Sequence, residues 1–346
     1  HTVTPMGKRW MHQWVSKPLL DVDLIRQRQD GVETFFTEGL LRAELRESLK
    51  PLGDLERMTQ RVVGGTAQPR DLVAMRDTLR QLPALHALLP DQEALENILR
   101  DFNLCNEELV LLESALEESP PATLQNIGVI RPGFSAELDG VLERSKHARE
   151  WIAGLEAEER ERTGVKTLKV GYNKVFGYYL EVTRANTELV PEEYIRKQTL
   201  VNAERYITPE LKEYETLVLN AEERIREIEA RLFREVCGQL EGSAKRLLST
   251  ARALAQLDVL SGLAETATLN AYVRPGVVAE DVLAIDEGRH PVVEHTLEGE
   301  RFVPNDVIFE EGERLRIITG PNMSGKSTLI RQVALIALMA VSYTHL

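Results

Sequence analysis

The sequence predicts a mainly α-helical protein that also carries a small β-containing domain and the N-terminal part of an α/β nucleotide-binding domain. Three observations predict this fold class. Apolar residues recur at helical spacing through most of residues 1–270. Two short segments within residues 168–182 alternate between polar and apolar residues, as half-buried strands do. A glycine-rich loop around residue 320 stands between an apolar run and a further helical pattern.

Composition limits the class of protein further. The chain has 346 residues, of which 43% are hydrophobic, and this is enough for two or three domains with cores of their own. It holds 55 acidic and 42 basic residues, and the net charge of −13 argues against a protein that is basic all over. A local nucleic-acid site remains compatible with this charge.

The cysteines and the apolar runs indicate the setting in which the protein works. Cys105 and Cys237 are far apart and match no metal-ligand spacing, so we expect a reducing, cytoplasmic environment. The longest late apolar run, from Val333 to Val341, is too short to span a bilayer. The first residues do not have the pattern of a signal peptide, and we expect none. We therefore expect no membrane partner.

The first 125 residues or so predict helices separated by short breaks. Residues 18–21 end one helix and cap the next, and later proline and glycine pairs mark further turns. Two apolar faces are predicted to be buried, one of them through Leu24, Val32 and Phe35 and the other through Leu72, Met75, Leu79 and Leu82. Nothing in this region carries chemistry.

Two long helices are predicted in the middle of the chain. From Ser135 to Thr163, apolar positions recur at alternating short and long helical steps, which is typical of a helix packed along a partner. The partner is predicted to begin at Thr208 and Pro209, a capping residue followed by proline at the first helical position. Its seam continues, with lapses at Gly238 and Gly242, to about Leu263. A chain that runs out on one long helix and back on another forms a lever arm.

The segment between these helices is strand-like and basic. Residues 168–172 and 178–182 are predicted to form a hairpin. Residues 164–209 hold seven Lys and Arg against five acidic residues, a net charge of +2, together with five of the eight tyrosines. Two interpretations remain open from composition: a small domain with a tyrosine core, or a grip on nucleic-acid phosphates by Lys, Arg and Asn.

The region from Ala271 leads into the nucleotide domain. Residues 273–276 break the preceding helix. His290 is expected to be a hydrogen-bonded turn residue and not a catalyst. For Phe302 two roles remain open, a core aromatic or a ring that stacks on adenine.

The glycine-rich loop predicts a phosphate site. From Gly320 to Ser327 the sequence reads G-x-x-x-x-G-K-S. We expect an apolar strand before it, through Leu315, Ile317 and Ile318, and a helix after it, through Leu329, Val333, Ile336, Ala337 and Ala340. The two glycines let backbone N–H groups point at phosphate oxygens, Lys326 reaches the β- and γ-phosphates, and the Ser327 hydroxyl ligates Mg²⁺. A glycine turn with a chance lysine is the weaker interpretation, because strand and helix patterns flank the loop.

Both ends of the sequence look cut. It begins at His1, without an initiator methionine, inside a helical pattern. Residues 341–346 (VSYTHL) break the apolar periodicity abruptly and are what a transposon end used in sequencing libraries would encode. We expect this hexapeptide to be a non-native tail and leave it out of the fold.

Taken together, these residues resemble the MutS family of DNA mismatch-repair proteins. Three stretches carry the resemblance: residues 4–9 (TPMGKR), 168–215 with GYNKVFGYYLEVTRAN and NAERYITPELKEYE, and 288–340 with EGRHPVVE, FVPND and TGPNMSGKSTLIRQVALIALMA. The resemblance covers essentially all of residues 1–340. It implies a helical core with long antiparallel lever helices, a clamp at the lever tip, and the N-terminal part of a P-loop ATPase domain of the ABC type.

The resemblance also implies a domain layout and an activity. The helical core and outgoing lever occupy 1–155, the clamp 156–209, the returning lever helix and core 210–270, and the N-terminal part of the ATPase domain 271–340. In the family, a dimer encircles double-stranded DNA, reads a mispair and exchanges ADP for ATP to become a sliding clamp. It then recruits a MutL-type partner. We expect such a protein to be cytoplasmic and associated with the nucleoid.

Site residues are carried over by position. Phe302 would stack on adenine. The ATP phosphates and Mg²⁺ would be held by Gly320, Pro321, Asn322, Met323, Ser324, Gly325, Lys326, Ser327 and Thr328, with Ser327 as the Mg²⁺ ligand. For clamp contacts to the DNA backbone the motif match singles out no residues, and our candidates are Lys169, Asn173, Lys174, Arg196 and Lys197.

The sequence also departs from the family pattern. The mismatch-reading domain with its Phe-x-Glu wedge is expected before His1. The acidic Asp-Glu motif and the signature segment of the ATPase are expected after Ala340, so the general base for hydrolysis has no candidate here. We therefore expect this chain by itself neither to recognise a mismatch nor to turn over ATP at a useful rate.

Three other interpretations compete with this one. A MutS paralogue that acts on recombination intermediates is disfavoured by Met323, Ser324 and Ser327 and by the tyrosine-rich hairpin. A coiled-coil ATPase that organises chromosomes is disfavoured because the phosphate loop follows the coil. A transporter ATPase is disfavoured by the long lever before the loop and by the lack of a membrane partner segment.

Overall fold

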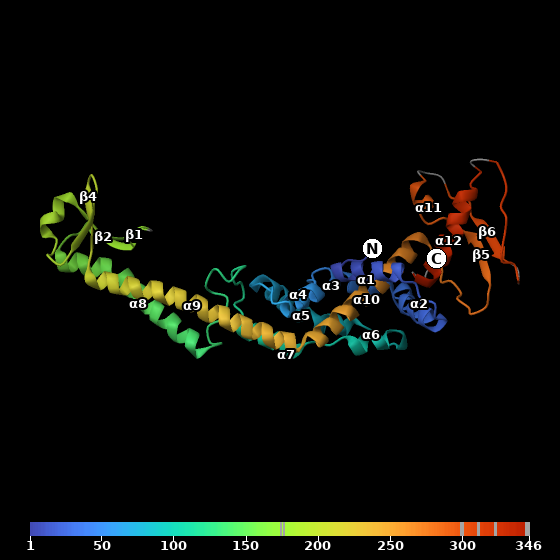
Figure 1. Ribbon diagram of the computed structural model, residues 1–346, viewed down its shortest axis with the longest axis horizontal. Helices are drawn as coiled ribbons and strands as arrows, with labels where there is room; N and C mark the ends of the chain where they lie inside the picture. Colours follow the sequence, from blue (N-terminus) through green and yellow to red (C-terminus); the bar gives the residue numbers. More distant parts are fainter. Residues whose placement is uncertain (174, 176, 298–300, 310–311, 322–323, 343–346) are drawn as a thin grey trace. The chain divides into compact units, whose positions relative to one another are not determined.

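Helices make up most of the chain in the computed structural model, which describes residues 1–173, 175, 177–297, 301–309, 312–321 and 324–342 (Figure 1). The α-helices of the first half are α1 (Pro5–Ser16), α2 (Val22–Thr37), α3 (Gly39–Leu49), α4 (Leu55–Val63), α5 (Pro69–Leu88), α6 (Glu96–Asp101), α7 (Asn106–Ala115) and α8 (Ala136–Thr163). Those of the second half are α9 (Pro209–Gly242), α10 (Ala244–Asn270), α11 (Val293–Thr296) and α12 (Lys326–Ser342). Short 3₁₀ turns are η1 (Glu93–Leu95) and η2 (Arg184–Leu189).

The strands form two small antiparallel sheets. The first contains β1 (Lys169–Asn173), β2 (Gly177–Thr183), β3 (Ile195–Thr199) and β4 (Ala203–Ile207). Their order across the sheet is β1-β2-β4-β3. The second sheet pairs β5 (Leu283–Gly288) with β6 (Asn305–Phe309). The chain divides into two compact units, one of His1–Gly64, Ala74–Leu109 and Glu241–Leu346 and the other of Gly65–Val73 and Val110–Leu240.

Helix α10 lies at the centre of the first unit. Helices α1, α2, α3, α4 and α6 all pack on it. More than half of its 27 residues are buried, and they lie on every side of the helix. A helix that is apolar all round must be enclosed by others, and here short amphipathic helices provide the enclosure.

One buried carboxylate joins the N-terminal segment to α10. Asp258, which is fully buried, accepts hydrogen bonds from the backbone N–H of Val3 at 2.8 Å and of Thr4 at 2.7 Å. It also accepts from the Thr4 hydroxyl at 2.6 Å, and this hydroxyl in turn caps α1 by accepting from the Gly7 N–H at 2.9 Å. A Cβ on Gly7 would lie 2.1 Å from the Asp258 carboxylate, so only glycine fits there.

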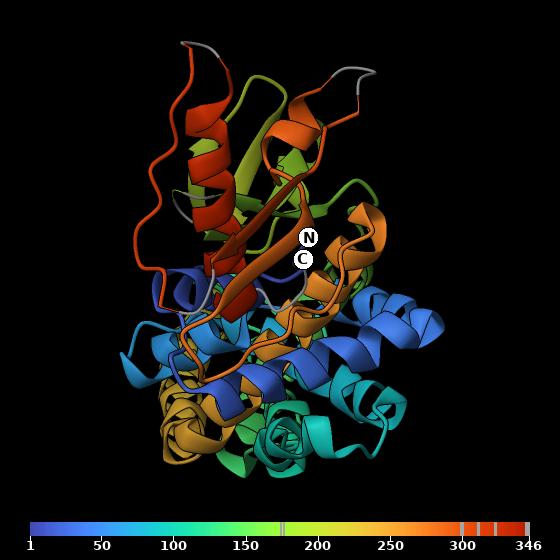
Figure 2. The ribbon, with the colours of Figure 1, turned by 90° about the vertical axis from the view of Figure 1, so that its right-hand side faces the viewer.

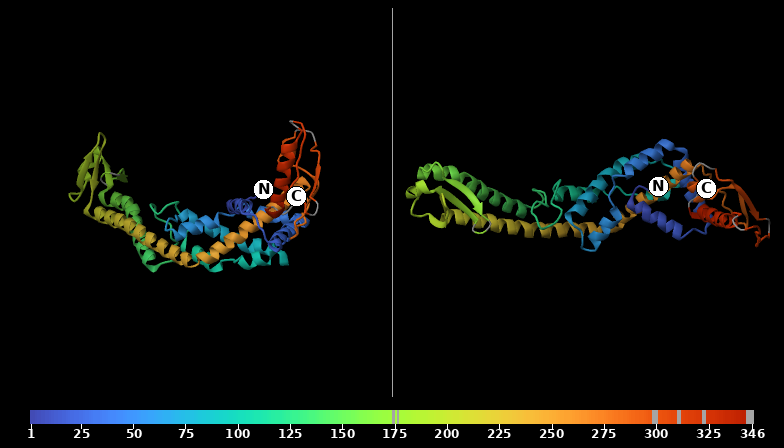
Figure 3. Two further views of the ribbon diagram at one scale, coloured as in Figure 1. Left: turned by 45° about the vertical axis from the view of Figure 1, so that its right-hand side comes forward. Right: turned by 90° about the horizontal axis from the view of Figure 1, so that it is seen from above.

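Helices α8 and α9 of the second unit form an antiparallel pair (Figures 1 and 3). Ala148, Ile152 and Leu155 of α8 share one buried cluster with Leu211 and Val218 of α9. The ring of Trp151 stacks on that of Tyr214, with 3.9 Å between centroids and 11° between planes. Ion pairs from Glu137 to Arg224 and Arg231 add to the contact on the solvent side. The predicted packing of this helix along a partner is thus confirmed, and Val141 belongs to its buried face.

A second buried carboxylate holds a loop of this unit. Glu229 of α9 accepts hydrogen bonds from the N–H groups of Gly128, Val129 and Ile130 at 2.9–3.1 Å. Burial raises the pKa of Glu229, while the three backbone donors act in the opposite direction. Without this carboxylate the loop would leave three donors unpaired beside an apolar core.

Local sequence signals account for most helix ends. Thr208 caps α9 by accepting from the Leu211 N–H at 3.0 Å, and Pro209 is its first residue, as predicted. The expected continuous helix breaks at Ser243, whose backbone leaves the helical region (φ −97°, ψ 4°). Two glycines and this serine are weak helix formers, which explains the break. No helix in the described part of the chain has the length and apolar character needed to cross a bilayer.

Two burial predictions differ from the structure. Leu24 was predicted on the buried face of α2, yet 48% of it is exposed, whereas Val32 and Phe35 are buried. Leu315 and Ile317 were predicted in a buried strand, yet they are 79% and 80% exposed and lie in no strand. A strand needs neighbours to pair its backbone groups, and within the described residues β5 and β6 pair only with each other.

The start of the nucleotide domain is held together by polar contacts. Figure 2 shows α12 beside the β5–β6 pair. Gln332 of α12 is fully buried, and its side-chain N–H donates to the carbonyl of Gly288 at 2.8 Å. His290 is buried, and its Nδ1 accepts from the N–H groups of Val292 and Val293. His290 is therefore a hydrogen-bonded turn residue, as predicted.

Alanine at Gly7 and at Gly154 should change stability in opposite directions. Gly7→Ala forces the new Cβ against Asp258 and should lower the free energy of unfolding by about 1–3 kcal/mol. Gly154 lies inside α8 with open space around it, so Gly154→Ala should raise the free energy of unfolding by about 0.5–1 kcal/mol. Urea denaturation of the two variants measures both values. Equal effects would contradict the packing at Gly7.

Candidate nucleic-acid interface and nucleotide site

The four-stranded sheet has one face against the helices and one face in solvent. Leu180, Val182 and Tyr206 lie on the inner face, in the same buried cluster as Leu155 and Leu211 of the helices. On the outer face, strand register places Lys169 opposite Glu181, and Glu181 opposite Arg205. The sheet therefore has a polar surface supported by a hydrophobic one.

Helix carboxylates fix the sheet to the helix pair. Glu156 of α8 accepts from the Val170 N–H of β1 at 3.0 Å. Glu159 of α8 accepts from the Tyr194 hydroxyl at 2.6 Å, immediately before β3. Burial and the neighbouring Glu159 together raise the pKa of Tyr194, so this hydroxyl stays a donor. Both edge strands are thus tied to one helix.

A third carboxylate fixes the start of β2. Glu215 of α9 is buried and accepts from the Tyr178 N–H at 3.3 Å and from the Lys212 ammonium at 2.9 Å. Gly177 has φ +85°, a left-handed backbone, and a Cβ there would lie 2.2 Å from the Glu215 carboxylate. The hairpin between β1 and β2 therefore depends on glycine at this position.

Arg205 is committed to contacts within the sheet. Its guanidinium lies 4.3 Å from the centroid of the Tyr179 ring, and it donates to Glu181 at 2.8 Å and to Gln198 at 2.9 Å. The Tyr179 ring in turn lies over Gly171, where a Cβ would be only 2.5 Å from the ring. These contacts hold the side chains at the centre of the outer face in place. Glu181 neutralises the charge of Arg205, which is one of the seven basic residues of this segment.

The predicted contact residues differ in their freedom to bind a ligand. Lys169 and Lys197 are exposed, and neither side chain takes part in a hydrogen bond or ion pair with any residue that the structure describes. Arg196 is exposed and approaches Glu204 at 3.4 Å. The Asn173 side-chain oxygen accepts from the Val175 N–H at 2.7 Å, so Asn173 shapes the turn after β1. Lys174 lies outside the described residues.

Three exposed cations lie on the two edge strands of the sheet. Lys169 belongs to β1 at one edge, and Arg196 and Lys197 belong to β3 at the other. The register of β3 shifts between Arg196 and Gln198, so Lys197 occupies a bulge, where a side chain is redirected. All five residues of β3 are exposed. The sequence analysis did not predict β3. Both faces of this strand are exposed, so its sequence lacks the alternation of polar and apolar residues that indicates a half-buried strand.

The glycine-rich loop has a glycine in the left-handed region immediately before helix α12. Gly325 adopts φ +83°, and helix α12 begins at the next residue, Lys326. The Lys326 ammonium donates to the carbonyls of Gly320 at 2.7 Å and Pro321 at 2.5 Å, and to the Ser324 hydroxyl at 3.3 Å. The lysine thus spans its own loop from one end to the other.

The other residues predicted to bind nucleotide lie in helix α12, in the segment before β6, or outside the described residues. Ser327 and Thr328 lie in the first turn of α12, where the free N–H groups and the positive end of the helix dipole favour an anion. Phe302 is half-buried in the segment before β6. Asn322 and Met323 lie outside the described residues. The residues present therefore fit phosphate oxygens and, through the Ser327 hydroxyl, Mg²⁺.

The fold is that of a mainly α-helical protein in which a helix pair carries a small antiparallel sheet and a glycine-rich loop precedes helix α12. Comparison with protein families identifies its family. Residues 1–264 match the model of MutS domain III, and residues 316–344 match that of MutS domain V. The first match alone covers well over half of the chain, so the chain belongs to the MutS family.

Individual relatives agree with the family match. The chain is 47% identical to the DNA mismatch repair protein MutS of Pelotomaculum thermopropionicum, over 98% of the chain and 40% of that relative. It is 48% identical to the MutS of Salinibacter ruber, over 98% of the chain and 38% of the relative. It is 46% identical to the MutS of Methanothrix thermoacetophila, over 98% of the chain and 40% of the relative. The chain thus spans about 40% of the length of the curated relatives that it matches.

Proposed function

We propose that this chain is the core, lever, clamp and first part of the ATPase domain of a DNA mismatch-repair protein. As a whole, that protein is an ATPase and an ATP-dependent clamp on double-stranded DNA that contains a mismatch. The single observation that carries the proposal is a sheet with unpaired cations on both edges, fixed by helix carboxylates, in a chain of the MutS family. Homodimerisation and recruitment of a MutL-type protein are part of the same proposal.

The clamp grips DNA through its phosphates. Lys169, Arg196 and Lys197 are charged side chains on exposed backbone, and they suit phosphate oxygens on either side of the sheet. Arg205, which could read a base with two donors, is already held by Glu181 and Gln198. The grip is therefore independent of base sequence, which suits a clamp that moves along DNA.

The loop and α12 hold the nucleotide. Backbone N–H groups of the loop and the start of α12 bind phosphate, and Lys326 exchanges its loop carbonyls for β- and γ-phosphate oxygens. Ser327 ligates Mg²⁺ and Phe302 stacks on adenine. The bound Mg²⁺ neutralises charge on the phosphates. The cofactors are therefore ATP, ADP and Mg²⁺.

Removing the three exposed cations of the edge strands should weaken DNA binding without changing its specificity. We expect the triple change of Lys169, Arg196 and Lys197 to Ala to reduce affinity equally for matched and mismatched duplexes. The slope of log affinity against log salt should become shallower by about 2–3, because about 0.9 counterion is released per phosphate neutralised. Fluorescence anisotropy at several salt concentrations measures both effects.

A matched control separates local contacts from net charge. The triple change of Lys17, Lys50 and Lys245 to Ala alters the charge equally at exposed positions of the first unit. It should leave the salt slope within about 0.5 of the unchanged protein. A loss of affinity for mismatched DNA alone in the clamp variant would contradict the phosphate-grip role.

Lys326→Ala should weaken binding of Mg·ATP by about tenfold to a hundredfold, as expected for a lost hydrogen bond to a charged group. Isothermal titration of Mg·ATP into the chain measures this loss, and Arg331→Ala, an exposed cation on the same helix, is the control. The chain by itself should show no useful steady-state hydrolysis. Measurable hydrolysis that Lys326→Ala abolishes would contradict that expectation.

A further inference from the structure

A small pocket of the first unit contains buried donors without acceptors. It lies between α1, α2, the segment around α6 and α10, with a volume of about 210 Å³. Its walls include Trp10 and Trp14 of α1 and Leu24, Gln27 and Arg28 of α2. No role in DNA or nucleotide binding has been assigned to any of these residues.

Arg28 is the most unusual residue of this pocket. The carbon of its guanidinium lies 3.8 Å from the centroid of the Trp14 ring, a cation–π contact. Its Nη1 is buried without a hydrogen-bond partner, and Arg28 forms no ion pair within the described residues. Burial lowers the pKa of Arg28 to about 10. A buried guanidinium nitrogen without an acceptor is costly, so a group that accepts its hydrogen bonds should bind here.

A second donor points to the same kind of ligand. The indole Nε1 of Trp10 is also buried without a hydrogen-bond partner. Nearby carboxylates do not serve Arg28, because Asp30 is paired with Arg274 at 2.6 Å and Asp23 with Arg26 at 3.9 Å. Two donors with no acceptor, one of them charged, fit a carboxylate, which accepts at two oxygens.

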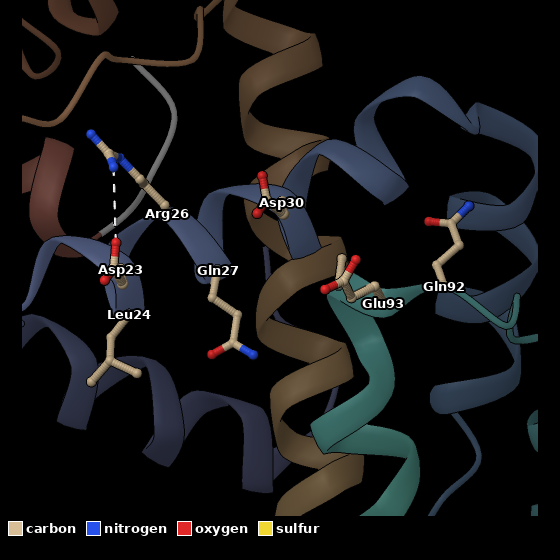
Figure 4. A pocket seen from close by; sticks show the side chains of 8 residues that line it. Asp23, Leu24, Arg26, Gln27, Asp30, Gln92 and Glu93 are labelled. Carbon is tan, nitrogen blue, oxygen red and sulfur yellow. Dashed lines mark ion pairs between the residues drawn. The ribbon is translucent and has the colours of Figure 1, made fainter.

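The apolar residues of the pocket wall indicate which kind of group binds beside the carboxylate. Leu24 is 48% exposed although it continues the apolar stripe of α2. Figure 4 shows Leu24 and Gln27, which line this pocket and an adjacent one, projecting on one side of α2, away from Arg26. A volume of about 210 Å³ is below the roughly 300–1,000 Å³ of small-molecule sites. It suits one or two side chains of a polypeptide.

We propose that this pocket binds an acidic side chain and a neighbouring aliphatic side chain from a segment of the same polypeptide that lies outside these 346 residues. The carboxylate pairs with Arg28 and Trp10, and the aliphatic group covers Leu24. The chain spans about 40% of its relatives, so most of a full-length polypeptide of their size lies outside it. A tethered segment has a high effective concentration, which allows so small a site to be filled.

Site-specific photocrosslinking in the full-length polypeptide encoded by the same gene tests this proposal. Leu24→p-benzoylphenylalanine should crosslink within the same molecule to a segment outside residues 1–346 that contains Asp or Glu. The control, Leu20→p-benzoylphenylalanine, lies on a residue that is 94% exposed and outside the pocket, and it should give no such product. Mass spectrometry identifies the segment, and mixing ¹⁵N-labelled with unlabelled protein separates intramolecular from intermolecular products.

The second step tests the carboxylate itself. Changing the crosslinked Asp or Glu to its amide should reduce the yield at position 24 by about tenfold, as expected for a hydrogen bond to a charged group. The proposal is overturned by a gene that encodes nothing beyond these residues, or by no crosslink. It is also overturned by a product with a second copy, DNA or another protein, by a segment without an acid, or by an unchanged yield in the amide variant. None of these outcomes depends on mismatch repair or ATP binding.

Discussion

Buried carboxylates on helices are the constraint on which both units depend. Asp258 holds the N-terminal segment to α10, Glu229 holds the loop at 128–130, and Glu159 holds the residue that leads into β3. Each carboxylate accepts hydrogen bonds where the chain has left regular structure and its donors would otherwise be buried without partners. Such a donor costs about 1–3 kcal/mol when unpaired, so these few side chains determine where the loops and the sheet lie against the helices.

The sheet shows how this constraint serves binding. Its inner face and its carboxylate anchors are internal, and so is Arg205, which is held by Glu181 over the Tyr179 ring. Each edge strand carries a cation with no ion-pair partner among the described residues, Lys169 on β1 and Lys197 on β3. The helix carboxylates and Arg205 are used for contacts that hold the sheet and its edge strands in place. The exposed cations of the edge strands remain available to a phosphate backbone. In the glycine-rich loop, similarly, the Lys326 ammonium is held by the backbone carbonyls of Gly320 and Pro321.

Features with local signals could be predicted from the sequence. The helix start at Thr208, the β1–β2 hairpin and the glycine turn at Gly325 depend on residues within a few positions of one another, and the family match confirms the fold class. Helix α1, in contrast, begins at Pro5 and not at His1, where the helical pattern was expected. Features that depend on contacts between residues far apart in the sequence could not be predicted in this way. Strands β3 and β4 pair across a bulge without a clear alternation, and Leu315 and Ile317 have strand character but no strand partner within the described residues. Glu159 occupies a buried position of α8 among apolar residues. A charged residue at such a position was the sequence signal that could have indicated a buried hydrogen bond like the one it accepts from Tyr194.

Hydrogen–deuterium exchange with mass spectrometry, with and without a matched DNA duplex, tests the central claim most directly. That claim is that a sheet fixed by helix carboxylates presents its edge cations to the DNA backbone. The account predicts slower exchange on DNA in β1 and β3, with little change in α8 and α9, which the carboxylates already hold rigid. Protection confined to the helices, with the exchange of both edge strands unchanged by DNA, would contradict it.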